Sequence, residues 1–398
     1  MPSTTAIDPE ALRAHAASVC GAEFVGPDNT AAPADTQQAA ELLHYADSND
    51  ISICPAGAGT KMEWLGGAPA AMSLSTRRMN AVLEHTWQDM TCTVQAGCTW
   101  SALQARLGEQ GQFVALDPLW ADHATVGGVV ASNDSGALRL RYGALRDLVI
   151  GMTLVLADGT IARSGGKVVK NVAGYDLPKL LCGSFGTLAF IADVTFRLHS
   201  KPLHITTLSM SASHAEPLGK LLLQVLDRHF STVSMQLRGG PQGFALDLRL
   251  NAMPSVAAQQ EEMLRGLGAS MQPAEESVWA AREALFTDRD GWLIVKATML
   301  PTGIAAAVQE IADAGGKVVA QATGILTGRV PRTSAGKLVR LRSWCEAQGG
   351  SLVLLHGDVV DGLDRWGTLP DSWPLMREVK RKFDPRITLN PGRFLGGI

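Results

Sequence analysis

The sequence predicts an α+β protein with more than one domain and a large buried core. The chain has 398 residues, which corresponds to about two to three domains at roughly 150 residues each. Hydrophobic residues make up 46% and charged residues 18%, a composition typical of a folded protein rather than a disordered one. Glycine-rich segments crowd the first half and become rare after Lys201-Pro202, so we place a domain boundary at residue 202.

Charge and hydropathy exclude several classes of protein. Lys and Arg number 35 against 38 Asp and Glu, and the net charge of −3 lacks the basic surplus of a nucleic-acid-binding protein. No run approaches the roughly 18 apolar residues of a membrane-spanning helix. The first residues, MPSTTAIDPE, contain acids and a proline, so we expect no signal peptide and a cytoplasmic protein.

The cysteines are scattered and give no sign of a metal site. None of them shows the two-residue spacing of a zinc, redox or iron–sulfur motif. We therefore predict no metal in this chain and expect buried thiols in a reducing compartment. The six residues are Cys20, Cys54, Cys92, Cys98, Cys182 and Cys345.

The first half mixes helices with short strands. Asp35, and Thr99 or Ser101, are the expected N-caps of two of the helices. Asp158-Gly159 stands between two β-branched runs, which is a strong hairpin signal. The expected helices are 9–20, 36–48 and 99–111, and the expected strands are 51–55 (stopped by Pro55), 72–79, 92–97, the hairpin 147–165, and 188–202.

The second half repeats a strand–helix–strand–strand–helix theme. This order predicts an antiparallel sheet with helices on one face. The expected strands are 205–212, 231–239, 244–252, 292–300, 317–326 and 351–357, and the expected helices are 215–228, 254–267, 302–314 and 334–347.

Three glycine-rich segments could carry chemistry. The first, PAGAGTK at residues 55–61, follows a strand, and its glycines would let successive N–H groups point into one concavity that suits an anion. The segment lacks the third glycine that a Rossmann fingerprint requires. The Gly-Lys-Ser/Thr sequence of a P-loop does not occur either. On its own this segment favours an ordinary turn over a phosphate site.

The other two segments are also ambiguous when taken alone. In ATVGGVVASNDSG, residues 124–136, small polar groups need partners that a ligand could supply, and the valines argue against an exposed loop. In KNVAGYDLPKLLCGSFGTLAFI, residues 170–191, Lys170 and Asn171 stand beside Gly174-Tyr175-Asp176. A helix ended by Gly183 and a tight turn would also explain that segment.

In this order and spacing, with RYG, FDP and LNPG, the segments resemble the vanillyl-alcohol-oxidase type of FAD-binding proteins. More narrowly, they resemble the branch that oxidises D-2-hydroxy acids, and within it the FAD-binding E subunits of bacterial glycolate oxidases. The resemblance covers residues 35–200 and the last 16 or so. It implies a two-lobed PCMH-type FAD-binding domain at 1–202 (lobe one about 1–90, lobe two about 91–202), an α+β cap domain at 203–380, and a tail at 381–398 that returns to the FAD domain.

The resemblance also implies where FAD binds. The first loop would hold the pyrophosphate, the second segment would line the ribityl chain and the ring, and the tail would return to the flavin. Some relatives bind flavin covalently through a His where Gly59 stands here, so we expect non-covalent FAD. The implied FAD-binding residues are Pro55, Ala56, Gly57, Ala58, Gly59, Thr60, Lys61, Asp117, Pro118, Ala124, Thr125, Gly127, Gly128, Asn133, Gly136, Tyr142, Gly143, Gly186, Ile191 and Asn390.

The sequence departs from the family at two places. The turn Gly183-Ser184-Phe185-Gly186-Thr187 has Phe where relatives often have Glu. His356-Gly357-Asp358 begins like a family metal motif, but its second His is missing, and we interpret His356 as a strand-end residue. Oxidation of a 2-hydroxy acid needs a cation for the carboxylate and a base for the hydroxyl proton, and the sequence identifies neither residue.

The predicted function is that of the FAD-binding subunit of a glycolate (D-2-hydroxy acid) dehydrogenase complex. Its partners would be a homologous flavin subunit and an iron–sulfur subunit, through which the chain could lie at the inner membrane. Two alternatives stay open. The chain could be a stand-alone FAD-dependent dehydrogenase for an alcohol or a 2-hydroxy acid, or a non-catalytic scaffold that FAD stabilises.

Overall fold

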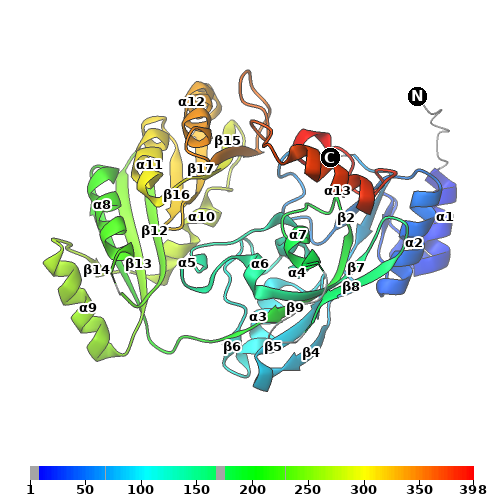
Figure 1. Cartoon of the computed structure of the whole chain (residues 1–398), viewed down its shortest axis with the longest axis horizontal. Coiled ribbons are helices and arrows are strands. Elements are labelled where there is room, and N and C mark those ends of the chain that lie inside the picture. Colours follow the sequence, from blue (N-terminus) through cyan, green and yellow to red (C-terminus); the bar gives the residue numbers. More distant parts are fainter. Residues whose placement is uncertain (1–8, 68, 167–174, 229) are drawn as a thin grey trace.

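The computed structural model describes residues 9–67, 69–166, 175–228 and 230–398. Within them, helices and four sheets form an α+β fold, as predicted (Figure 1). Two of these sheets belong to the N-terminal half of the chain, and an eight-stranded sheet, which we call the cap sheet, belongs to the C-terminal half. The fourth is a small pair formed by β6 (Gln112–Phe113) and β10 (His199–Ser200).

The first sheet is parallel and carries the first glycine-rich loop. It has the order β1-β3-β2, and α1 and α2 pack on it. The side chain of Asp35 accepts a 2.9 Å hydrogen bond from Gln38 N, which confirms the predicted N-cap of α2. Pro55 does not stop β2, because β2 is an edge strand and loses no ladder bond there. The bounds are α1 Pro9–Cys20, β1 Thr30–Ala31, α2 Thr36–Ser48, β2 Ile53–Ala56 and β3 Met72–Ser75.

The second sheet is antiparallel, with the order β4-β5-β9-β7-β8. Val155 pairs with Ile161, so the hairpin around Asp158-Gly159 is confirmed. Strand β4 was not expected; its turn to β5 uses Met90 at a φ of 54° rather than a glycine, so the usual turn signal is missing. The bounds are β4 Val82–Thr86, β5 Thr91–Gln95, β7 Val149–Val155, β8 Ile161–Gly165 and β9 Phe190–Arg197.

Short helices cover this second sheet. Thr99 accepts from Ala102 N at 3.3 Å and so caps α3. The valines of the second glycine-rich segment are fully buried, as expected, because that segment folds into α4 and packs on the sheet. Gly127 is required there, since a Cβ would lie 2.8 Å from the Cβ of Ala96. The bounds are α3 Trp100–Gly108, α4 Val126–Ser132, α5 Arg139–Tyr142, α6 Leu145–Leu148 and α7 Leu177–Leu181.

The cap sheet has the palindromic strand order β14-β11-β13-β12-β16-β17-β15-β18. Its two halves each repeat the same strand and helix order, so the repeated theme is confirmed. The single strand expected at 317–326 is wrong, because the chain turns after Gln321 and forms two antiparallel strands, β16 and β17. The strands are β11 Ile205–Ala212, β12 Thr232–Gly240, β13 Gly243–Asn251, β14 Gln272–Pro273, β15 Trp292–Thr298, β16 Lys317–Gln321, β17 Ile325–Pro331 and β18 Ser351–His356. The helices are α8 Ala215–Leu226, α9 Pro254–Gly266, α10 Ala281–Ala284, α11 Ile304–Asp313 and α12 Ala335–Glu346.

The two faces of the cap sheet differ in chemistry. One face carries an apolar core with α8, α11 and α12, which includes Leu237, Leu248 and Val295. The opposite face carries buried polar side chains such as Gln236 and Gln321 and meets the N-terminal half of the chain. In Figure 1 the helices α8 and α11 lie on the outer side of this sheet, away from the strands β7 and β9.

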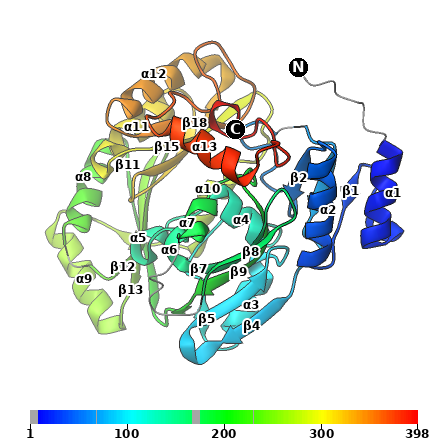
Figure 2. The same ribbon diagram turned by 45° about the vertical axis from the view of Figure 1, so that its right-hand side comes forward.

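The C-terminal helix α13 (Trp373–Phe383) returns to the N-terminal half. Its residues Val379 and Phe383 pack against the core of the second sheet, and Lys380 Nζ donates to Thr187 O at 2.7 Å. Figures 1 and 2 both show α13 beside α4 and α7. The return therefore begins within α13 rather than at residue 381, and the other domain boundaries stay predictions. No helix in the described ranges has the length and apolar character needed to cross a membrane.

Candidate functional site

The three glycine-rich segments and the tail meet at one cleft. The loop after β2, the helix α4, the turn that precedes β9 and the residues after α13 form its walls. Most of the predicted FAD-binding residues lie in these walls, namely Pro55, Ala56, Gly57, Ala58, Gly59, Thr60, Lys61, Thr125, Gly127, Gly128, Gly186, Ile191 and Asn390. Met62, Thr76, Ala131, Ser132, Phe185, Ala189, Phe190 and Arg393 complete the lining.

The loop after β2 approaches α4 closely at Gly57, which has no side chain. A Cβ on Gly57 would overlap the hydroxyl of Thr125, which is the N-cap of α4. Gly59 has a φ of +79°, a conformation that other residues adopt only at a cost. The two glycines let the backbone of the loop line the cleft closely, and backbone N–H groups of such a loop suit a diphosphate.

Asn390 and Phe185 form the junction between the tail and the second sheet. Both have left-handed backbones, with φ of 43° and 52°. Asn390 Nδ2 donates a 2.8 Å hydrogen bond to Phe185 O, and this bond fixes which end of the amide is the oxygen. Asn390 Oδ1 is buried and has no hydrogen-bond partner among the described residues. A ligand that donates a hydrogen bond would satisfy it.

Arg393 is a buried cation in the wall of the cleft. The residue is 4% exposed, and its Nη2 donates to Lys61 O at 3.1 Å. Its Nε and Nη1 have no partner among the described residues. Burial lowers the pKa of its guanidinium below the usual range. Together with Asn390 Oδ1, these N–H groups show that the cleft fits a ligand with both acceptors and a donor.

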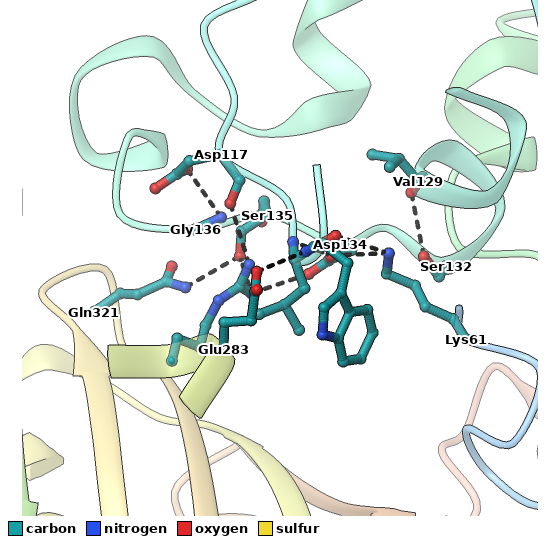
Figure 3. A network of polar contacts seen from close by, with 12 residues as sticks. Lys61, Asp117, Val129, Ser132, Asp134, Ser135, Gly136, Glu283 and Gln321 are labelled. Carbon is teal, nitrogen blue, oxygen red and sulfur yellow. Dashed lines mark hydrogen bonds and ion pairs between the residues drawn. The ribbon is translucent and has the colours of Figure 1, made fainter. Parts of the chain in front are cut away.

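Lys61 lines the cleft, but its ammonium belongs to a cluster beside it (Figure 3). Lys61 Nζ lies 3.3 Å from the buried carboxylate of Asp134, and burial lowers the pKa of this lysine. The same carboxylate accepts from Arg282 Nη1 at 2.9 Å and from Leu119 N at 2.8 Å. Although burial acts to raise it, the charges of Arg282 and Lys61 hold the pKa of Asp134 below its usual range.

This interface cluster, which we define as Lys61, Asp117, Asp134, Arg282, Glu283 and Gln321, joins the cap sheet to the segment 117–136. Arg282, in α10, also donates to Ser135 O and Asp117 O. Trp120 N donates to Glu283 Oε2 at 2.8 Å, and Gln321 Nε2 donates to Ser135 O at 3.1 Å (Figure 3). No sequence pattern predicts this cluster, because its members are far apart in the chain.

Seven of the predicted FAD-binding residues do not line the cleft. The Asp117 carboxylate instead accepts hydrogen bonds from Gly136 N, Ala137 N and Leu138 N, and burial raises its pKa. Gly136 is needed for that contact, since a Cβ there would overlap this carboxylate. The seven residues that lie outside the cleft lining are Asp117, Pro118, Ala124, Asn133, Gly136, Tyr142 and Gly143.

The roles of those residues follow from their surroundings. Ala124 is fully buried in the core of the second sheet. The ring of Tyr142 makes an edge-on contact with Phe113 and a tilted contact with His199. Asn133, with a φ of 48°, ends α4, while Gly143 has a φ of +87° before α6. Lys170, Asn171 and Gly174 from the third segment lie outside the described residues.

Two further cations face the contact between the N-terminal half and the cap sheet. Lys296, on β15, is half-buried and interacts electrostatically with Asp134 and Arg282, and burial lowers its pKa. Arg139, at the start of α5, is also half-buried, and burial lowers its pKa as well. Within the described ranges, neither side chain has a hydrogen bond or ion pair. No group of three or more His, Cys, Asp or Glu in those ranges is placed to bind a metal.

The comparisons with known proteins point to FAD as a cofactor. The model of a family described as an FAD binding domain matches residues 27–165, a range that contains the first loop and α4. Glycolate oxidase subunit GlcD of Bacillus subtilis is 36% identical over 179 residues, which cover 44% of this chain and 38% of that protein. D-lactate dehydrogenase of Archaeoglobus fulgidus is 27% identical over 403 residues, and the match covers 91% of this chain and 90% of that protein.

The alignments differ in extent. D-2-hydroxyglutarate dehydrogenase of Stutzerimonas stutzeri is 23% identical, and the match covers 98% of this chain and 96% of that protein. The matched part of this chain spans only 38% of the Bacillus subtilis subunit and 31% of the mitochondrial D-lactate dehydrogenase of Arabidopsis thaliana.

Solved structures support the fold over almost the whole chain. The structure titled FgChi7B has a TM-score of 0.70 at 15% identity and covers 96% of this chain and 98% of that one. An alkyldihydroxyacetonephosphate synthase has a TM-score of 0.69 at 16% identity, with coverage of 91% and 76%. The family match and the unpartnered polar atoms of the cleft agree that the cofactor of this chain is FAD.

Proposed function

Because residues 27–165 match the model of an FAD binding domain, we propose that this chain is an FAD-dependent oxidoreductase of the 2-hydroxy acid dehydrogenase type. Three relatives support the class of substrate, since their names are those of a glycolate oxidase subunit, a D-lactate dehydrogenase and a D-2-hydroxyglutarate dehydrogenase. The substrates in these names share a carboxylate next to a carbon that carries a hydroxyl group.

The observation that carries the proposal is a pair of half-buried cations, Lys296 and Arg139, at the contact between the N-terminal half and the cap sheet. Lys296 shares its face of β15 with Ile294, which packs against Trp64 and Leu119 of the N-terminal half. Its neighbours on the strand, Val295 and Ala297, point to the apolar core on the other face. The ammonium of Lys296 is therefore directed at the N-terminal half, where Arg139 also lies. A bound carboxylate would compensate both half-buried charges.

In this account the chain binds and orients the substrate. When bound, FAD supplies the acceptor for the hydride that leaves the hydroxyl-bearing carbon. Lys296 and Arg139 hold the substrate carboxylate, and the cluster around Asp134 keeps the cap sheet fixed over the N-terminal half. The aromatic rings of Trp64, Trp120 and Phe286 pack together beside the cluster and exclude water from it.

We further propose that the FAD is dissociable. Covalent flavin attachment needs a His, Cys or Tyr side chain at the ring, and none of the described residues that line the cleft is of these types. The resemblance of the first loop to its family implies that Gly59 stands where some related proteins carry the linking His. Denaturation in acid should therefore release the whole of the flavin into the supernatant.

The physiological setting that we propose is a glycolate dehydrogenase complex with a homologous flavin subunit and an iron–sulfur subunit. The relative from Bacillus subtilis is named as a subunit, which supports an assembly. All six cysteines of this chain are free and dispersed, so electrons would have to leave through a partner's cluster. Co-expression with candidate subunits, followed by gel filtration, tests the assembly.

Anaerobic mixing of the FAD-loaded chain with glycolate, D-lactate or D-2-hydroxyglutarate tests the function. The proposal predicts that at least one of these acids bleaches the flavin absorbance. Turnover with an artificial acceptor would support a stand-alone dehydrogenase, and bleaching without turnover would support an electron relay within a complex. Flavin that no acid bleaches, in the chain alone or in the complex, would contradict the proposal and support a scaffold.

A further inference from the structure

Among the buried arginines of the described residues, Arg393 has the fewest partners for its charge. Arg282 binds the carboxylate of Asp134 and two backbone carbonyls, and Arg342 binds Asp364 and Leu352 O. Arg329 donates to the carbonyls of Thr287 and Asp288. Arg393 has only the carbonyl of Lys61, although it is as deeply buried as these three.

An arginine in this state needs a further partner. A buried charge without compensation costs several kcal/mol, and two unsatisfied N–H groups add to that cost. Arg393 lines the FAD cleft, so the partner belongs to the FAD. The FAD offers two groups of suitable chemistry, which are the pyrophosphate and the N1–C2=O edge of the flavin ring.

Asn390 distinguishes between these two groups. Its Oδ1 is a buried acceptor that needs a donor, and it lies in the same wall, where Arg393 N donates to Asn390 O at 3.2 Å. A pyrophosphate has only acceptors and would leave Asn390 Oδ1 unsatisfied. The pyrimidine edge of a flavin presents the acceptor C2=O beside the donor N3–H, which matches both side chains.

The surroundings of Arg393 also suit the ring. Its guanidinium lies 5.9 Å from the centre of the Phe185 ring, which lines the cleft. Phe185 in turn contacts Phe394 and Trp366, so this end of the cleft is aromatic. A flat aromatic ring system packs well in such a place, whereas a doubly charged diphosphate does not.

We propose that Arg393 and Asn390 bind the pyrimidine edge of the flavin, with the guanidinium at N1–C2=O and the amide oxygen at N3–H. Reduction places negative charge on N1–C2=O, so the guanidinium binds the reduced ring more tightly than the oxidised ring. Arg393 thereby raises the reduction potential of the bound FAD. This inference depends on FAD binding alone and not on the proposed substrate.

The test compares R393M and R393K with the control R386Q. Arg386 lies in the same tail but is half exposed and pairs with Asp47 and Asp50. We would measure the dissociation constants of FAD and ADP for the flavin-free chain and the two-electron potential of bound FAD. In R393M the ratio of the affinities for reduced and oxidised FAD should fall about tenfold, which lowers the two-electron reduction potential of bound FAD by about 30 mV. R393K should recover most of it, and ADP binding should not change.

If R393M does not bind FAD, its reduction potential cannot be measured. The melting temperature of the flavin-free variant then shows whether the chain still folds. Removal of an uncompensated buried charge should leave that temperature equal or higher, while the increase that FAD brings becomes smaller. Equal weakening of FAD and ADP at an unchanged potential would assign Arg393 to the pyrophosphate and overturn the proposal. Wild-type affinity and potential in R393M would overturn it as well, as would a flavin-free R393M that does not fold while R386Q does.

Discussion

Arg282 in α10 and Asp134 after α4 form an ion pair of 2.9 Å, and this largely buried pair joins the cap domain to the segment 117–136. Their exposed fractions are 11% and 2%, so water screens the pair little. Because Lys61 of the first loop contacts the same carboxylate, one side chain connects three segments that the FAD cleft needs. The stability of the cleft and the attachment of the cap sheet should thus depend on Asp134.

The first prediction concerns that carboxylate. D134N leaves Lys61 and Arg282 buried without a counter-charge and should cost about 3–5 kcal/mol of unfolding free energy. Urea denaturation measures this cost, and D227N provides the control, because Asp227 is an exposed residue at the end of α8. A loss within about 0.5 kcal/mol of that of D227N would show that the cluster does not hold the structure together.

Acid should weaken the same cluster. The pKa of Asp134 is lower in the folded chain than in the unfolded chain, so its contribution is complete above the unfolded value near 3.8. The contribution is lost as the pH falls through the lower, folded value. The wild type should therefore lose stability below about pH 4 more steeply than D134N does, as urea midpoints across this range would reveal. Parallel profiles would argue against a charged Asp134.

The second prediction concerns the first loop. G57V places a branched side chain where even a Cβ overlaps Thr125, so the loop must move and FAD retention should be lost. The ratio of flavin to protein absorbance after gel filtration reports this. G266A is the matched control, because Gly266 ends α9 and has open space around it. A G57V variant with its full share of flavin would show that the loop does not bind FAD.

The third prediction concerns Lys296 and the substrate. K296M should raise KM for a 2-hydroxy acid about ten- to hundredfold, which corresponds to the loss of a charged hydrogen bond of about 1.5–3 kcal/mol. K317M serves as the control, since Lys317 is exposed on β16 of the same sheet. An equal KM in both variants would exclude Lys296 from the substrate site.

The pH profile gives a second readout for Lys296. Burial holds its pKa below 10.5, and only the protonated form binds a carboxylate. KM should be lowest at pH values below this lowered pKa and should rise as the pH passes through it. In K296M the rise should disappear, whereas K317M should keep it.

The fourth prediction concerns the attachment of the tail. Lys380 Nζ donates to the carbonyls of Thr187 and Leu389 and to the carboxylate of Asp384, all buried. K380M should cost about 3–5 kcal/mol and weaken FAD binding, because Asn390 follows directly after Leu389. K382M, on the exposed side of the same helix, should leave both quantities unchanged. Equal melting temperatures for the two variants would contradict this role of the tail.

The local signals in the sequence predicted much of the fold. Asp35 and Thr99 cap helices, Asp158-Gly159 forms a hairpin, and the repeated theme becomes a palindromic sheet. Each of these features depends on residues that are close together in the chain. Strand β4 and the continuation of β2 past Pro55 were not predicted, because a non-glycine turn and an edge position carry no local signal. Strand β17 was also missed, because its first residues were assigned to one strand with β16.

The candidate site was predicted only in part for the same reason. The glycines of the first loop and Asn390 belong to recognisable segments, and the structure brings them to one cleft. Asp117 belongs to such a segment too, but its carboxylate holds the backbone of residues 136–138, which no sequence pattern reveals. Arg393 and Lys296 were missed, because their importance comes from burial without a partner, a property that exists only in the folded chain.

Whether this chain binds FAD is decided by titration of the flavin-free chain with FAD, with flavin absorbance and the melting temperature as readouts. The account predicts stoichiometric binding, a yellow protein after gel filtration, and a melting temperature that rises with FAD concentration. A chain that stays colourless in excess FAD, and whose melting temperature does not change, would contradict it.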